Sequence, residues 1–507
     1  MTDNCSSKES VLINGSVRGI LTSLCACLLV LMLLITRTAL AEGTEMVSDF
    51  SGLAWEEAFA QLHARLSREY AFTEWKGLDW TSLEAAYSPK IAKAQTNDDF
   101  EAYYLTLREY VHEVPDGHVH IDNIAETDKK YIGGGVGFAI AALDDGRVIA
   151  SWVDESSTAW AEGLREGDEV LTWNMRPVQS AIEEGSTLFA TNSATSENLR
   201  HKKAQYLTRA PIGTKIALTY QSRESGQLTS AVLTASDDRG LSLRKGYPAA
   251  VLSDKIREMI RGVESESPVP EAMVEMRMLD GNLAYVKVWG ELDADLRGAG
   301  KYVSTVALSR QAIQTIIESG CENLILDLRN NIGGEDAMAA AILGSFYGER
   351  QFYEYQNAYD QATGVRRIQV ADTESGGLPL WIEPAEHIFA GRVIALINQE
   401  CISSGEGIAM GIRNLPNGET LGFFGTNGSF GLSGPQAIMP GGLVVHWPSG
   451  QSLDENKQIQ LDSRNNTGGI APSIRIPWTL ENAIRAAQGE DVELESAILH
   501  LGQPERD

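Results

Sequence analysis

The second half of the chain alternates short, continuously apolar segments with helical patterns, and this alternation restricts the fold more than any other feature. The apolar segments cover residues 283–288, 324–328 and 393–397, and the helical patterns cover residues 306–319, 336–346 and 405–413. Strands that are apolar at every position are buried on both faces, and intervening helices allow such strands to run parallel. We therefore expect a multidomain α/β protein whose core, residues 276–507, is a mostly parallel sheet covered by helices.

The first 41 residues differ in character from the rest of the chain. Lys8 and Arg18 precede an apolar run over residues 20–35, and Ala39 and Ala41 supply the small residues of a cleavage site. This order is typical of a signal peptide, so we expect an exported protein that is periplasmic or secreted. A retained membrane anchor is the alternative, because the apolar run approaches the length that spans a bilayer.

The overall composition excludes some classes of partner. The 507 residues suffice for about three domains of ordinary size, and their 43% hydrophobic and 22% charged residues are normal values for globular proteins. The formal net charge of −27 repels phosphate backbones and anionic lipids. We expect no nucleic-acid partner, no membrane partner after signal cleavage and no cofactor, whereas a homo-oligomer stays open.

Residues 42–128 are expected to form an N-terminal helical domain. Spacings of four, three and four place one set of apolar residues on a single helix face, namely Trp55, Phe59, Leu62 and Leu66. Thr81 and Thr96 are each followed three residues later by a carboxylate, a pattern typical of helix starts. The aromatic stripe is interpreted as core.

Residues 129–237 read as short apolar strands separated by turns. The loop formed by Gly135, Val136, Gly137 and Phe138 is followed, at residues 159–171, by Ala-Trp-Ala-Glu-Gly-Leu-Arg-Glu-Gly-Asp-Glu-Val-Leu. Together these segments resemble the PDZ domain signature. The resemblance implies that the loop's backbone N–H groups bind the C-terminal carboxylate of a peptide that adds a strand to the sheet edge. Residues 238–275 read as a connector.

Two expected strands of the core end in polar segments. Asp-Leu-Arg-Asn-Asn-Ile-Gly-Gly occupies residues 327–334, and Asn-Gln-Glu-Cys-Ile-Ser-Ser-Gly-Glu occupies residues 398–406. Open α/β sheets gather their sites at the carboxyl ends of the strands. A serine at a helix start, such as Ser403, lies beside unpaired N–H groups that can stabilise an oxyanion. Ser403 is interpreted as a nucleophile, with a helix cap as one alternative and Ser404 as the rival nucleophile.

These two segments resemble the motifs of the tail-specific, or C-terminal-processing, serine peptidase family, and the resemblance covers most of the chain after the signal. It implies that Ser403 is the nucleophile. It also implies an oxyanion hole formed by the backbone N–H groups of Gly333 or Gly334 and of Ser404.

The general base of the commoner branch of this family is a lysine, and Leu432 stands at the corresponding position. No lysine occurs between Lys301 and Lys457. Asp-Gly-His at residues 116–118 instead resembles the motif of the tricorn-core branch, which implies that His118 is the base. An imidazole titrates near neutral pH and can move the serine proton to the leaving amine.

Two other roles are compatible with the position of His118. It can be a histidine held by structural hydrogen bonds. It also shares a strand face with His120, and with His112 the two could bind a metal ion. No cysteine or paired carboxylate motif stands nearby, so we expect no metal site.

A third residue should orient the imidazole. The resemblance implies an acidic residue shortly before a Gly-Val-x-Pro segment, which corresponds here to residues 469–472 and places Asn466 at the acidic position. An asparagine can orient a histidine but cannot stabilise imidazolium by charge. Asp462 and Glu455 are the alternatives.

The sequence therefore predicts an exported serine endopeptidase that cleaves proteins or peptides by acyl transfer and recognises accessible substrate C-termini through its PDZ domain. The departures at Leu432 and Asn466 leave a second hypothesis, a catalytically inactive peptide-binding scaffold of the same family. A metal-dependent hydrolase that uses the histidines is the third.

Overall fold

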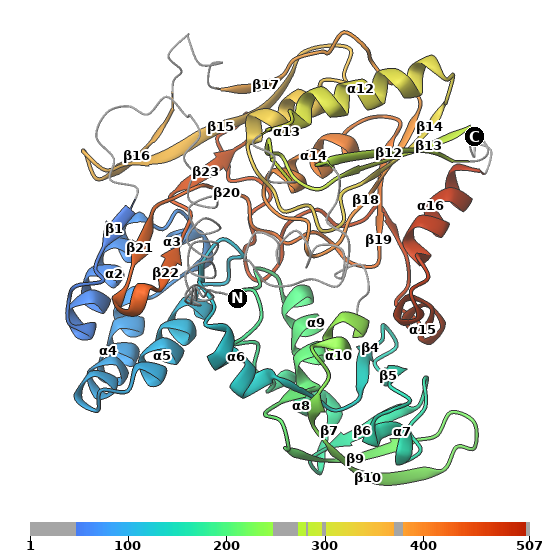
Figure 1. Cartoon of the computed structure of the whole chain (residues 1–507). Coiled ribbons are helices and arrows are strands. Elements are labelled where there is room, and N and C mark those ends of the chain that lie inside the picture. The colour runs from blue at the N-terminus through green and yellow to red at the C-terminus, as the bar shows by residue number, and fades with distance from the viewer. Residues whose placement is uncertain (1–46, 247–271, 280–281, 297–300, 370–378, 503–507) are drawn as a thin grey trace, which may run out of the picture.

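The computed structural model describes residues 47–246, 272–279, 282–296, 301–369 and 379–502. The expected signal peptide, residues 1–41, lies outside these ranges. Within them, none of the helices combines the length and apolar character that crossing a membrane requires. Figure 1 shows a helical N-terminal region in blue, a β-rich region in green and an α/β core that runs from yellow to red.

The N-terminal region is built mainly from helices. Its elements are α2 (Trp55–Glu69), α3 (Thr73–Lys76), α4 (Trp80–Thr96) and α5 (Phe100–His112). Phe59, Leu62 and Leu66 are buried, and the Trp55 ring stacks on that of Tyr103 at 4.8 Å between centroids. The aromatic stripe is thus core, as predicted.

The predicted starts of two of these helices were wrong. Helix α4 begins after Asp79, whose carboxylate accepts the Ser82 N–H, and α5 begins after Asp99, whose carboxylate accepts the Ala102 N–H. Thr81 lies inside the first turn of α4, while Thr96 ends α4 and donates its hydroxyl to the Ala92 carbonyl. Aspartate caps a helix at least as well as threonine. Each aspartate stands at the residue before the first helical turn, where the backbone is not yet helical.

A small sheet joins the N-terminal region to the C-terminal part of the chain. Strand β1 (Val47–Asp49) pairs in parallel with β21 (Gln436–Ile438), and β2 (His120–Ile121) pairs antiparallel with β22 (Val444–His446). The order is β1-β21-β22-β2. This pairing brings the segment around His118 against residues that lie far later in the sequence.

The β-rich region is an antiparallel sheet of order β10-β9-β6-β5-β4. These strands are β4 (Phe138–Ala142), β5 (Val148–Val153), β6 (Glu169–Trp173), β9 (Lys215–Gln221) and β10 (Leu228–Thr234). The short β3 (Gly134–Gly135) pairs with β8 (Arg209–Ala210) and β11 (Ser236–Asp237). Short helices complete the region, namely α6 (Ala125–Ile132), α7 (Thr158–Ala161), α8 (Val178–Glu183), α9 (Ser196–Leu207) and α10 (Leu241–Gly246).

The core sheet has the order β12-β13-β14-β18-β19-β24, and all of its pairs except β12 with β13 are parallel. Its strands are β12 (Val274–Leu279), β13 (Leu283–Val288), β14 (Asn323–Asp327), β18 (Arg392–Leu396), β19 (Gly418–Gly422) and β24 (Ile474–Arg475). The multidomain α/β fold with a mostly parallel core sheet is confirmed.

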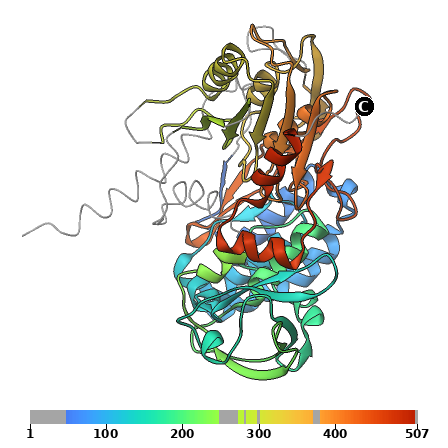
Figure 2. The same ribbon diagram turned by 90° about the vertical axis from the view of Figure 1, so that its right-hand side faces the viewer.

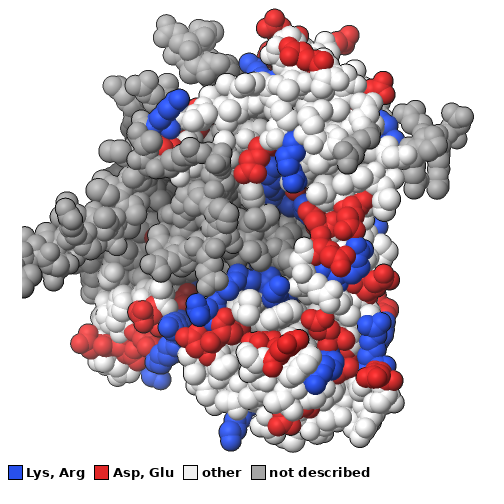
Figure 3. All heavy atoms as spheres, turned by 45° about the vertical axis from the view of Figure 1, so that its right-hand side comes forward, with Lys and Arg blue, Asp and Glu red and all other residues white. Residues whose placement is uncertain are grey.

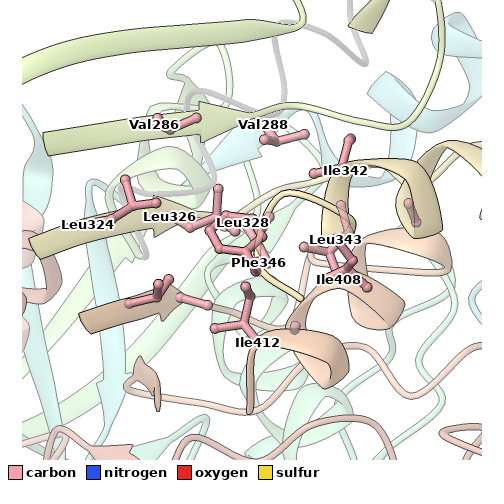
Figure 4. Packing of buried hydrophobic residues seen from close by; sticks show 14 of the residues in the cluster. Val286, Val288, Leu324, Leu326, Leu328, Ile342, Leu343, Phe346, Ile408 and Ile412 are labelled. Atoms are coloured by element: carbon pink, nitrogen blue, oxygen red, sulfur yellow. The ribbon is translucent and has the colours of Figure 1, made fainter. Parts of the chain in front are cut away.

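Helices cover the core sheet on both faces. On one face, α12 (Thr305–Glu318), α13 (Asp336–Leu343) and α14 (Ser404–Arg413) pack against the even-numbered apolar residues of β13 and β14. Figure 4 shows this packing for residues of α13 and α14. On the other face, α15 (Leu480–Gln488) and α16 (Val492–Leu501) pack together with Ala141 and Ile149 of the β-rich region. Figure 2 shows these red helices between the core and the green region.

A second, smaller sheet extends from the core with the order β16-β15-β23-β20, and β17 pairs with β15. Its strands are β15 (Gln351–Asp360), β16 (Val365–Ile368), β17 (Leu380–Ile382), β20 (Gly431–Leu432) and β23 (Gly450–Leu453). On the face shown in Figure 3, acidic and basic side chains lie intermixed.

Candidate active site

Ser403 lies at the turn between β18 and α14, where it is the residue before the first helical turn. Its backbone has φ 59° and ψ −133°, a conformation that is uncommon for a residue with a side chain. Its N–H donates to the Ser429 carbonyl at 3.1 Å and to a carboxylate oxygen of Glu406 at 3.2 Å. Ser403 is half-buried in this strained turn.

Gly333 packs directly against Ser403. A Cβ at position 333 would lie 2.6 Å from the Ser403 Cβ and 3.3 Å from its Oγ, and Gly333 has φ +75°. Glycine is therefore required both for the backbone conformation and for the space. At Gly334 an added Cβ would overlap the Glu291 backbone. The Gly-Gly loop and the predicted nucleophile are brought together.

The candidate oxyanion donors differ in their present partners. The Gly333 N–H donates to Asn331 Oδ1 at 2.9 Å, so it is engaged inside its own loop. Ser404 is the first residue of α14, where a helix offers its N–H no intrahelical acceptor. Gly334 forms an isolated β-bridge with Glu291. The hydrogen bonds of this bridge are donated by the N–H groups of Glu291 and Glu335, and the Gly334 N–H donates neither of them. Of the candidate oxyanion donors, the N–H groups of Ser404 and Gly334 therefore need the least rearrangement to bind an oxyanion.

Ser404, the rival nucleophile, is fully buried. Its hydroxyl donates to Glu291 Oε2 at 2.7 Å, and Glu291 also accepts from Asn331 Nδ2 at 2.8 Å. Burial raises the pKa of Glu291 to about 7. The Ser404 hydroxyl therefore belongs to a buried network that supports the Gly-Gly loop.

The segment that carries His118 touches the segment that carries Ser403. The Gly117 N–H donates to Ser429 Oγ at 2.8 Å, while the Ser429 carbonyl accepts the Ser403 N–H. A Cβ at Gly117 would lie 2.8 Å from Ile402 Cδ1. The residue before His118 and the residue before Ser403 are thus neighbours, and Ser429 binds the backbone of both segments.

His118 lies beside a carboxylate from its own motif. Its Nδ1 is 3.5 Å from Asp116 Oδ1, and that same oxygen accepts the His118 backbone N–H at 2.9 Å. The side chain of His118 is 24% exposed. Burial lowers the pKa of His118, but the carboxylates of Asp116, Asp462 and Glu406 outweigh this effect and raise it.

Asp116 is a residue that the sequence analysis did not assign a role. It is fully buried, accepts the Tyr70 hydroxyl at 2.7 Å and lies 3.9 Å from Lys76 Nζ. Burial alone raises the pKa of Asp116, but Lys76 and His118 hold it well below its ordinary value. A buried, ionised carboxylate therefore stands next to the imidazole. The Asp-Gly-His spacing was the signal that could have found it.

The three residues proposed to orient the imidazole occupy different surroundings. Asp462 is buried 2.9 Å from Lys76 Nζ and accepts the Phe430 N–H, and burial raises its pKa to about 6. Asn466 is exposed, and its carbonyl accepts the Ser196 N–H. Glu455 is also exposed. Asp462 alone of these three shares a partner with Asp116.

Glu406 is a second residue that the sequence analysis did not assign a role. It is fully buried and accepts from the Thr426 hydroxyl at 2.6 Å and from the N–H groups of Gly428, Ser429 and Ser403. Burial raises its pKa to about 7. Glu406 therefore ties the Ser403 turn to the loop that contacts Gly117. Its position three residues after Ser403, typical of a capping box, was the available signal.

The remaining predicted residues lie elsewhere. Leu432 is in β20, where it packs on Gly450. His112 directs its ring nitrogens at the carbonyl oxygens of Arg108 and Ala190, so it does not join His118 in a metal site. The loop of Gly135, Val136, Gly137 and Phe138 is buried, and the Val136 N–H donates to the Thr208 carbonyl at 3.2 Å.

Three protein-family models match the chain. The model of peptidase family S41 matches residues 283–476, the tricorn protease C1 domain matches residues 52–102, and the PDZ domain matches residues 135–241. The first match contains Gly333, Gly334 and Ser403. His118 lies in the interval between the second and third matches. None of the curated protein sequences matches the chain.

Solved structures of other proteins align with most of the chain. Mature CPAF aligns with a TM-score of 0.61 at 14% identity, covering 89% of this chain and 96% of CPAF. Mature CPAF complexed with lactacystin aligns with a TM-score of 0.59 at 14% identity, covering 89% of this chain and 97% of that one. A putative peptidase from Parabacteroides merdae aligns with a TM-score of 0.46 at 16% identity, covering 88% and 96%. At such identities the first two matches show the fold.

Proposed function

Because the chain belongs to the S41 family of peptidases and combines tricorn C1 and PDZ domains, we propose that it is a serine endopeptidase with Ser403 as nucleophile and His118 as general base. One observation carries the proposal: Ser429 accepts the Gly117 N–H through its hydroxyl and the Ser403 N–H through its carbonyl. The two segments that hold the reacting side chains are therefore fixed to one residue.

The chemistry follows from the groups around this contact. His118 removes the proton from the Ser403 hydroxyl as the oxygen attacks the scissile carbonyl, and it later gives that proton to the leaving amine. Asp116, ionised and 3.5 Å from the ring, stabilises the imidazolium that forms between these steps. Asp462, whose carboxylate pairs with Lys76, adds negative potential that also stabilises the imidazolium of His118.

The oxyanion of the tetrahedral intermediate is stabilised by backbone N–H groups. Ser404 supplies one from the start of α14, and the Gly-Gly loop supplies another from Gly334 or, after release of Asn331, from Gly333. Collapse of the intermediate releases the amine and leaves the acyl group on Ser403. Water then attacks this ester by the reverse sequence of proton transfers.

Substrate capture is assigned to the PDZ domain. Strand β4, which begins at Phe138, is the last strand of its sheet, and an edge strand is where a peptide can add. The substrates are proteins or peptides with accessible C-termini, held by the loop from Gly135 to Phe138. The apolar run of residues 20–35 assigns the enzyme to an exported compartment.

An inactive peptide-binding scaffold is the second candidate. The observation that favours it is the hydrogen bond from the Gly333 N–H to Asn331 Oδ1, which occupies one expected oxyanion donor. In that case peptides bind to the PDZ domain and remain intact.

Reaction with a fluorophosphonate probe separates the two candidates. We expect the wild-type chain to be labelled once. Ser403→Ala and His118→Gln should lose labelling, because the first variant lacks the nucleophile and the second lacks the general base. Ser404→Ala should keep the label, which separates the two adjacent serines. His500→Ala is the matched histidine control, because His500 lies in α16 and its ring pairs with Glu419 of β19. A labelled Ser403→Ala chain, or an unlabelled wild type that binds peptide, contradicts the proposal.

A further inference from the structure

Three side chains outside the candidate catalytic group lie close enough to share one metal ion. They are His120, Asp122 and His446, and one possible ligand atom from each lies within 4.8 Å of the others. His120 and Asp122 come from the N-terminal region, whereas His446 comes from the C-terminal part of the chain. The group differs from the one that the sequence suggests, His112, His118 and His120.

The backbone explains why these residues meet. His120 and His446 are directly opposite each other in the antiparallel pair of β2 and β22, and their rings stack at 4.5 Å between centroids with 12° between planes. Asp122 follows two residues after His120, so the alternation of a strand directs it to the same side. Its N–H continues the pairing by donating to the Val444 carbonyl at 3.0 Å. The Asp122 carboxylate is 3.8 Å from His446 Nε2.

The surroundings of His120 resemble those of a metal-ligating histidine. Its Nδ1 lies 3.2 Å from the His118 carbonyl oxygen, and as a donor to that oxygen it carries the proton on Nδ1 and the lone pair on Nε2. Histidines that bind metal ions commonly donate their other N–H to a backbone carbonyl in this way. The hydrogen bond therefore selects the tautomer that a ligand needs.

The group is also accessible. The side chain of Asp122 is 58% exposed and that of His446 is 24% exposed, and His120 is exposed as well. An ion can enter from solvent and keep water in its coordination shell. The acidic chain, with its formal charge of −27, favours the approach of cations.

We propose that His120, Asp122 and His446 bind one divalent transition-metal ion such as Zn²⁺, with water completing the coordination. Two imidazoles and one carboxylate suit Zn²⁺ and Co²⁺, whereas Mg²⁺ and Ca²⁺ take oxygen ligands. The ion crosslinks β2 to β22 and so fixes the strand that follows His118 to the C-terminal part of the chain. The ion takes part in no step of the hydrolysis. The proposal of this metal site does not depend on the proposed function.

Titration of the full chain with Co²⁺ tests the site, because cobalt bound by imidazole absorbs visible light. We expect one Co²⁺ per chain, displaced by Zn²⁺, and affinity at least about tenfold weaker in His446→Ala and in Asp122→Asn, since loss of a mere outer-shell partner already weakens metal binding about 10–100-fold. Zn²⁺ should raise the Tm of the wild type by mass action and, at the same Zn²⁺ concentration, raise the Tm of both variants by less.

The controls keep the result interpretable. His500→Ala should bind Co²⁺ as the wild type does, since His500 lies in α16. The Tm measured in EDTA shows whether each variant is folded, and the exposed Asp122→Asn change is expected to leave it unchanged. The proposal is overturned if the wild type shows no saturable Co²⁺ binding, or if His446→Ala and Asp122→Asn both bind Co²⁺ with wild-type affinity.

Discussion

The chain has two glycine-containing loops that its sequence suggests for the same task, the presentation of backbone N–H groups to negatively charged oxygen. Around Gly333, the space that a side chain would fill is taken by Ser403, a residue of another element. Around Gly135 and Gly137, that space is taken by Asp238 and Ser157 of the same β-rich region. A change in the first loop should therefore impair chemistry, and a change in the second should impair stability.

The largest difference between the loops should appear in catalysis. Gly333→Ala places a methyl group 2.6 Å from the Ser403 Cβ in a backbone conformation with φ +75°, so the loop or the serine must move. Loss of one oxyanion donor costs about 10²–10³ in kcat, and we expect a fall of that size in peptide hydrolysis. Gly146→Ala, with φ +88° and nothing within 4 Å, is the matched control and should retain activity. Equal hydrolysis by Gly333→Ala and Gly146→Ala would contradict a catalytic role for the loop around Gly333.

The second loop should respond in stability. In Gly137→Ala the new methyl group overlaps the Ser157 side chain at φ +85°, and we expect the free energy of unfolding to fall by about 3 kcal/mol. Gly146→Ala should lose only about 1–2 kcal/mol, the cost of the left-handed backbone. Urea denaturation measures both. Fluorophosphonate labelling of Ser403 should persist in Gly137→Ala; its loss would show that the two loops are coupled.

The loops should also differ in how pH acts on them. Glu291, which supports the Gly-Gly loop, has a pKa raised to about 7 by burial. The folded state then holds a proton that the unfolded state loses near pH 4.5, so stability falls as pH rises between these values, by at most about 1.4 kcal/mol per pH unit. Glu291→Gln should reduce this slope in denaturation curves measured from pH 5 to pH 7. An unchanged slope would mean that Glu291 is ionised throughout.

The carboxylate beside the second loop should behave in the opposite sense. Burial alone raises the pKa of Asp238, but Arg209 and Ser242 lower it overall. Its contribution is therefore present above the unfolded pKa near 3.8 and is lost as pH falls through the lower folded value. Asp238→Asn should cost about 1 kcal/mol at pH 7, and less at pH 3. A cost that is constant with pH would argue against the Arg209 pairing.

The sequence predicted the core well because its strands are marked locally. The expected strand at residues 283–288 coincides with β13, and those at 324–328 and 393–397 differ from β14 and β18 by one residue at each end. The starts of helices were harder to predict, since Asp79 and Asp99 compete with nearby threonines for the same capping role. The boundaries of the domains stay predictions.

The neighbourhood of the imidazole was the least predictable part. Alignment with the family motif placed Asn466 at the position that orients the imidazole, but Asn466 is exposed. Asp116, Asp462 and Lys76 instead form a buried group of charges. These three residues come from three separate segments. Their mutual distances depend on how the segments pack, and no spacing within one segment encodes them.

Hydrophobic periodicity and backbone preference act between near neighbours, so the amino-acid order alone indicates the main core strands and helices, the Gly-Gly loop and the serine at the start of α14. The contacts of Gly117 with Ile402 and Ser429, and the pairing of His120 with His446, arise from tertiary packing. These residues are separated by more than half the chain, and their contact results from the pairing of β1 and β2 with late strands and from a core shared by both ends.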